Sequence, residues 1–156
     1  MLVFLFVKMG YTGITKYTHM MKFIKDNSLV LGLIIALAGM LGSLYFSEVM
    51  GLVPCALCWY QRIAMYPLVI IFAVGILKKT NQAWDYAVAF VLAGLIIGVY
   101  QYLLVQGFIS EAIATCSIGV PCTKLDWSMF GFINIPFLSL LAFVCLGILY
   151  IITRKK

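Results

Sequence analysis

Charge is what this 156-residue chain most lacks: 10% of its residues are Asp, Glu, Lys or Arg, whereas 65% are hydrophobic. A soluble domain carries about 25% charged residues. Water could not solvate a surface built from this composition. The sequence therefore excludes an ordinary soluble domain and predicts that a lipid bilayer is its solvent. A single domain is the expectation at this length.

Many catalytic groups are also missing. The chain has one histidine, His19, and five acidic residues. It contains no Ser-His-Asp set, no paired carboxylates, no P-loop and no dinucleotide fingerprint. Basic and aromatic residues do not interleave as they do in RNA- or DNA-binding patches, so the net charge of +6 does not indicate a nucleic-acid partner.

Four apolar runs are long enough to cross a membrane as helices. They contain 19, 17, 21 and 18 residues and cover 29–47, 61–77, 86–106 and 135–152. At about 1.5 Å per residue each reaches roughly 25–32 Å, close to the hydrocarbon thickness of about 30 Å. Polar and apolar residues do not alternate, which excludes a barrel. The sequence predicts an all-α integral membrane four-helix bundle, with glycines such as Gly42 and Gly94 allowing close helix approach.

The N-terminal part of the chain, residues 1–20, is expected to be an extension, and residues 21–156 to form the four-span membrane domain. Met1–Val7 is apolar but too short to span a bilayer, and it has neither the basic region nor the cleavage site of a signal peptide. Met20 and Met21 stand just before the basic flank of the first run. Translation beginning there is a hypothesis.

Basic residues gather on one side of the predicted spans. Nine of them lie in the N-terminal segment, the link between the second and third runs, and the C-terminus, and two, Arg62 and Lys124, belong to the other side. The positive-inside rule then places both termini in the cytoplasm. The remaining loops, about 48–60 and 107–134, face outward. His19 falls on the cytoplasmic side, which excludes histidine chemistry at the outer face.

Four of the five cysteines fall in these two outer loops, where disulfides persist. Cys55 and Cys58 form a CxxC pair at the mouth of the second run, and Cys116 and Cys122 form a second pair. A ring as small as that of CxxC adds little loop-closure stability, so the spacing favours thiol–disulfide exchange. The second pair, in a longer loop, is expected to be accessible to a soluble partner.

Cys58 is expected in the first turn of the second helix, whose outer end should extend through Trp59 and Tyr60. Unpaired N–H groups and the helix dipole favour a thiolate at that position. Arg62 follows four residues later on the same helical face, where its guanidinium would favour the thiolate further. The alternative is an arginine that reaches the lipid headgroups.

Other interpretations of the cysteines remain open at this point. The four could form two structural staples, or a tetrathiolate zinc site, although 58 positions separate Cys58 from Cys116. We expect no metal. Cys145 lies in the middle of the last run and is most simply a small buried hydrophobe.

The sequence around both cysteine pairs resembles the DsbB/BdbC family of bacterial disulfide-bond formation proteins. One matching stretch is Pro54-Cys-Ala-Leu-Cys-Trp-Tyr-Gln-Arg-Ile-Ala-Met-Tyr-Pro67, and the other joins Cys116–Cys122 to Phe130-Gly-Phe-Ile-Asn-Ile-Pro136. The similarity extends from about Met21 to the C-terminus. The short gap between the second cysteines is closer to the Gram-positive, BdbC-type branch.

The resemblance implies a thiol–disulfide oxidoreductase in the bacterial plasma membrane, with its redox loops extracytoplasmic. It would reoxidise a soluble, DsbA/BdbD-like thioredoxin-fold partner that oxidises secreted proteins, and would pass two electrons to a membrane quinone, menaquinone rather than ubiquinone. By position, Cys116 would form the mixed disulfide with the partner. Cys122 would exchange with Cys55, and Cys58 would face the quinone beside Arg62.

Two positions depart from the family pattern. Gln101 stands where many relatives carry a histidine; it could hydrogen-bond a quinone carbonyl but cannot accept a proton as imidazole does. Gln61 stands where relatives often carry an acidic residue.

Two alternatives to this function remain. A vitamin-K-epoxide-reductase-like enzyme places its quinone-facing CxxC near the last span, unlike this chain. A non-enzymatic membrane scaffold would use the cysteines to staple its loops.

Overall fold

The computed structural model describes residues 19–109, 128–129 and 133–154. Four long helices dominate: α2 (Ser28–Leu44), α3 (Ala56–Leu77), α4 (Ala83–Val105) and α5 (Ile135–Arg154). A π-helical turn, η1 (Tyr45–Val49), extends α2, and residues 19–26 are helical. The predicted four-helix membrane bundle is confirmed. One small addition to the all-α prediction is the antiparallel pair of two-residue strands β1 (Ser128–Met129) and β2 (Ile133–Asn134).

All four helices are long and apolar enough to span a bilayer, counting α2 with η1 as one span. The second span departs most from its predicted bounds, because it begins at Ala56 rather than at residue 61. The helix extends beyond Tyr60 and Trp59, through which the sequence already extended its outer end, and starts where Cys55 caps it. The polar residues Gln61 and Arg62 are buried against the rest of the bundle.

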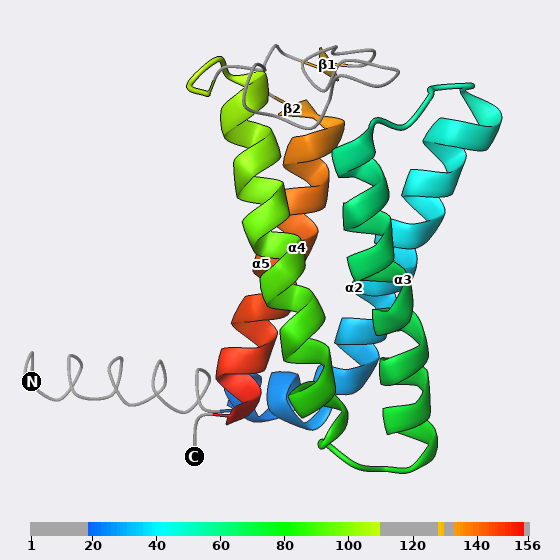
Figure 1. Ribbon diagram of the computed structural model, residues 1–156. Helices are drawn as coiled ribbons and strands as arrows, with labels where there is room; N and C mark the ends of the chain where they lie inside the picture. The colour runs from blue at the N-terminus through cyan, green and yellow to red at the C-terminus, as the bar shows by residue number, and fades with distance from the viewer. Residues whose placement is uncertain (1–18, 110–127, 130–132, 155–156) are drawn as a thin grey trace, which may run out of the picture.

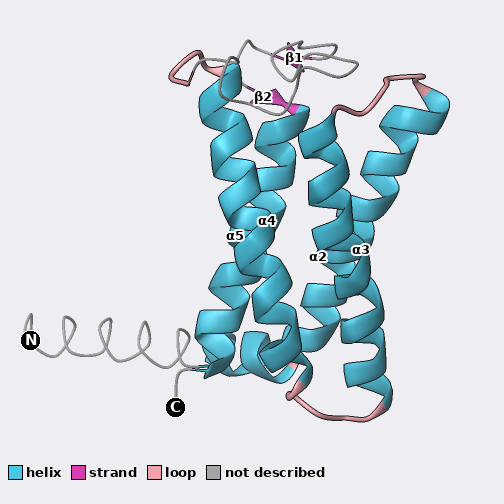
Figure 2. Ribbon diagram, viewed as in Figure 1, coloured by secondary structure: helices cyan, strands magenta, loops and turns pink. Residues whose placement is uncertain are grey.

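The helices form a closed ring in which α3 packs between α2 and α4, and α5 packs against both α4 and α2. Figure 1 shows α2 beginning and α5 ending at the same end of the bundle. The loop of residues 50–55, which leads into α3, lies at the opposite end, together with the end of α4 and the start of α5 (Figure 2). This end therefore gathers the residues around the CxxC pair.

The core lies toward the other end and is aromatic. Trp84, Phe72 and Phe143 are fully buried, and the rings of Phe72 and Trp84 meet edge to face with centroids 4.7 Å apart. Gly94 lets α4 approach α5, because a Cβ at that position would overlap the ring of Phe143. Gly42 does not have the predicted packing role, since a Cβ there would meet nothing within 4 Å.

Candidate active site

A cysteine caps the N-terminus of α3. Cys55 has extended backbone angles (φ −70°, ψ 170°), and its Sγ accepts a hydrogen bond from the backbone N–H of Cys58 at 3.4 Å. Ser, Thr, Asp and Asn usually occupy this position, because their oxygen satisfies an N–H that the helix leaves unpaired. The sulfur of Cys55 takes that role here. The cap places Cys58 in the first turn of the helix, where its spacing predicts it.

The two sulfur atoms of the CxxC pair lie 2.8 Å apart, and both cysteines are free thiols. Hydrogen bonding to Cys58, followed by burial, raises the pKa of the Cys55 thiol. Either sulfur could donate the hydrogen bond between them. The pair is a hydrogen-bonded dithiol in which the two sulfurs are not equivalent.

Gln101 reaches the pair from α4. Its side chain is 1% exposed, and its Nε2 lies 3.4 Å from Cys55 Sγ and 3.3 Å from Cys58 Sγ. The sequence predicted Gln101 as a quinone contact, whereas the structure places its amide nitrogen against both sulfurs. The Oε1 atom of the same amide is buried without a hydrogen-bond partner among the described residues.

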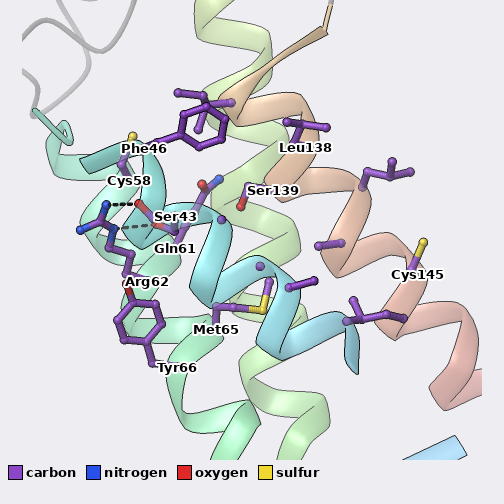
Figure 3. Close-up of a pocket in the computed structure, with 17 residues that line it drawn as sticks. Ser43, Phe46, Cys58, Gln61, Arg62, Met65, Tyr66, Leu138, Ser139 and Cys145 are labelled. Atoms are coloured by element: carbon purple, nitrogen blue, oxygen red, sulfur yellow. Dashed lines mark hydrogen bonds between the residues drawn. The ribbon is translucent and has the colours of Figure 1, made fainter. Parts of the chain in front are cut away.

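Arg62 is 9% exposed and turns toward α2. Its Nε donates to Ser43 Oγ at 2.8 Å, its terminal nitrogen donates to the Ser43 carbonyl at 2.9 Å, and its guanidinium carbon lies 5.2 Å from the centre of the Trp59 ring. Figure 3 shows these bonds to Ser43. In the described part of the chain, neutral groups rather than a carboxylate hold this cation. Its hydrogen bonds go to Ser43, and it lines the same cavity as Cys58.

A cavity of about 420 Å³ opens between α2, α3 and α5, and both Cys58 and Arg62 line it (Figure 3). Most of its lining is apolar, from residues such as Phe46, Met65 and Leu138. Cys145 also lines the cavity and is half-buried. The sequence predicted a small buried hydrophobe here, and the structure places Cys145, partly buried, in the cavity wall.

Two residues that line this cavity carry buried hydrogen-bond donors without a partner among the described residues. Gln61 is 6% exposed and its Nε2 has no partner within the described residues; the same holds for the buried hydroxyl of Tyr66. The Gln61 amide nitrogen lies against α4, 3.4 Å from where a Cβ on Gly98 would stand. Sequence reasoning noted Gln61 only as a family departure and missed Tyr66. A glutamine and a tyrosine inside a spanning helix were the available signal.

The second cysteine pair, Cys116 and Cys122, lies outside the described residues, so its position relative to Cys55 stays a prediction. The zinc hypothesis needs both pairs and also stays untested. The described residues alone contain no group of three or more His, Cys, Asp or Glu side chains that could hold a metal.

A dithiol at the N-terminus of a spanning helix, beside a cavity between spanning helices, defines a membrane thiol–disulfide oxidoreductase. The chain belongs to the DsbB family: the family model "Disulfide bond formation protein DsbB" matches residues 25–153. It is thus a multi-pass membrane protein of disulfide-bond formation.

Individual relatives agree with this assignment. The chain is 45% identical over 136 residues to "Probable disulfide formation protein C 2" of Bacillus anthracis, covering 87% of this chain and 96% of the relative. It is 45% identical over 113 residues to "Disulfide bond formation protein C" of Bacillus subtilis (strain 168), covering 71% and 80%. A "Probable disulfide formation protein" of Metapseudomonas resinovorans is 36% identical over 131 residues, covering 83% and 91%. No solved structure shows significant similarity to the chain.

Proposed function

We propose that this protein reoxidises a soluble, extracytoplasmic thioredoxin-fold thiol oxidase and delivers the electrons to a membrane quinone, with menaquinone as the expected acceptor. The observation that supports this most directly is the position of Cys58. Its thiol belongs to the CxxC pair and also lines the cavity between α2, α3 and α5.

The electron route needs two exchanges and one oxidation. The partner's dithiol reduces the Cys116–Cys122 disulfide, and the resulting dithiol reduces the Cys55–Cys58 disulfide through a mixed disulfide between Cys122 and Cys55. The reduced CxxC pair, which is the form seen here, then returns to the disulfide by giving up two electrons and two protons. A quinone held beside Cys58 would supply the acceptor for these two electrons and two protons.

The cavity fits such a ligand. Its apolar walls suit a ring and an isoprenoid tail, and ligand sites of this kind carry only a few polar groups that fix orientation. The unpaired donors of Gln61 and Tyr66 match the two carbonyl acceptors of a quinone. An unsatisfied buried donor costs about 1–3 kcal/mol, which a ligand with acceptors would recover. Gln61, Tyr66 and Arg62 are the residues expected to hold the ring beside Cys58.

The outward position of the CxxC pair is part of the proposal. The charged ends of the helices support it, since Lys78 and Lys79 follow α3 and Arg154 ends α5, at the end of the bundle opposite Cys55. Cationic residues mark the cytoplasmic side of membrane proteins. The dithiol would then face the compartment in which secreted proteins acquire disulfides.

Turnover of the purified protein tests the function. Reduced BdbD-type partner is mixed with a soluble menaquinone analogue, and quinone reduction is followed by absorbance. Cys55→Ser and Cys58→Ser are expected to abolish quinone reduction, whereas Cys116→Ser and Cys122→Ser abolish oxidation of the partner. Full activity in any of these four variants would contradict the route, and absence of wild-type turnover would favour the scaffold alternative.

A further inference from the structure

Gln101 bonds to the redox pair and not to the cavity. Its Nε2 is within hydrogen-bond distance of both sulfurs, at 3.4 Å from Cys55 and 3.3 Å from Cys58, whereas Gln101 is absent from the cavity lining. A carboxamide nitrogen carries two N–H groups, so a single amide can donate to two acceptors. The geometry is that of a donor shared between the two sulfurs.

Packing alone does not account for this amide. Gln101 is 1% exposed, and its Oε1 has no partner in the part of the chain that the structure describes. An apolar side chain would fill the same space without leaving a buried acceptor unpaired, which costs about 1–3 kcal/mol. The bonds to sulfur are therefore the feature that a glutamine adds at this position.

We infer that Gln101 is a positioning residue of the Cys55–Cys58 pair, whose amide stabilises the reduced sulfurs and so makes the pair more oxidising. The inference rests on the pair being redox-active, as in the proposed function.

The physical reason is a difference in acceptor strength between the two redox states. A hydrogen bond favours the species that carries more negative charge on the acceptor, and only the reduced pair can release a proton and leave that charge on sulfur. A donor fixed at both sulfurs thus favours the dithiol over the disulfide. Stabilising the reduced form raises the reduction potential of a dithiol pair, which helps it to oxidise its own reductant.

A redox titration without quinone tests this inference. The full-length chain carrying Cys116→Ser and Cys122→Ser is purified in detergent and equilibrated with glutathione. One disulfide and two glutathione thiols exchange with one dithiol and one glutathione disulfide. Mass-tagged maleimide then counts the free thiols. Gln101→Met keeps the length of the side chain but removes the donors, and should shift the equilibrium roughly three- to tenfold toward the disulfide; tenfold corresponds to about 30 mV.

Two further variants make the result decisive. Gln101→Leu also removes both donors and adds no charge, so it should shift the equilibrium in the same direction. It also decides the question if Gln101→Met does not fold. Gln106→Met is the matched control, because Gln106 lies at the end of the same helix, is exposed, and bonds to Tyr102. Its dithiol–disulfide equilibrium should equal that of the protein in which Gln101 and Gln106 are unchanged.

The outcomes separate the two proposals. If the Cys55–Cys58 pair forms no reversible disulfide in any glutathione buffer, the proposed function fails. If the pair titrates normally and both Gln101 variants follow Gln106→Met, the proposed function stands and the inference about Gln101 is overturned.

Discussion

At the scale of single residues, Arg62 illustrates how a charge is kept inside a spanning helix. Two of its N–H groups bond to the hydroxyl and carbonyl of Ser43, and the ring of Trp59 covers its plane. These neutral partners reduce the cost of burial without cancelling the charge. The cation therefore keeps its attraction for electron-rich groups in the cavity that it lines.

Ser43→Ala should destabilise the protein. The substitution removes the acceptor of the Arg62 Nε–H, and a hydrogen bond lost from a buried charged group costs about 1–3 kcal/mol. The free energy of unfolding in detergent measures the change. Ser47→Ala is the control, since Ser47 Oγ bonds only to the nearby Leu44 carbonyl and Glu48 among the described residues, and should change stability by less than about 0.5 kcal/mol. Equal effects would mean that Ser43 does not hold Arg62.

Gln61→Leu should separate ligand binding from stability. The Gln61 Nε2 atom has no partner among the described residues, so its removal should leave the unfolding free energy unchanged or higher. Quinone affinity should nevertheless fall by roughly tenfold, the equivalent of about 1.4 kcal/mol for one lost donor. Quenching of tryptophan fluorescence measures affinity, because Trp59 covers Arg62 at the cavity wall. Unchanged affinity would remove Gln61 from the quinone site.

At the scale of helices, the close approach of α4 and α5 depends on the missing side chain at Gly94. Gly94→Ala forces a Cβ into the ring of Phe143, and overpacking of this kind costs about 1–3 kcal/mol. Gly42→Ala meets open space and should not destabilise the protein, because alanine favours a helix over glycine by about 1 kcal/mol. Thermal unfolding in detergent compares the two variants. A destabilised Gly42→Ala beside an unaffected Gly94→Ala would contradict the packing described here.

The same scale shows what the sequence can and cannot predict. The four spans follow from apolar runs, because only a helix satisfies its own backbone in lipid. The apolar run was placed at residues 61–77, with its outer end extended through Trp59 and Tyr60, whereas α3 begins at Ala56. The start depends on the cap that Cys55 forms, which hydropathy does not show. The prediction that Cys58 lies in the first turn of α3 was correct, because it depended only on the local spacing of residues.

Contacts between distant residues were beyond the sequence. Gln101 and Cys55 are 46 positions apart, and nothing in the local pattern shows that the amide meets sulfur instead of a ligand. The bond between Arg62 and Ser43 spans 19 positions and depends on how α2 packs against α3. Such contacts depend on how each helix is rotated about its own axis. A helix that is apolar on every face gives no sequence signal for that rotation.

At the scale of the whole molecule, the basic residues and the redox-active pair are separated along the axis of the bundle. The CxxC pair and the start of the cavity lie at one end, and Lys78, Lys79 and Arg154 lie at the other. The positive-inside rule then predicts an extracytoplasmic dithiol. This orientation is required for the proposed function, since a soluble oxidase of secreted proteins cannot reach a cytoplasmic thiol.

Thiol labelling of intact cells tests the orientation. In a chain whose five native cysteines are replaced by serine or alanine, a single cysteine is introduced as Val53→Cys before α3 or as Asn81→Cys between α3 and α4; both positions are exposed and lie at opposite ends of the bundle. A membrane-impermeant maleimide should label the first variant and leave the second unlabelled until the cells are lysed. Labelling of Asn81→Cys alone in intact cells would invert the bundle, placing Cys55 and Cys58 in a reducing compartment where a disulfide relay cannot persist.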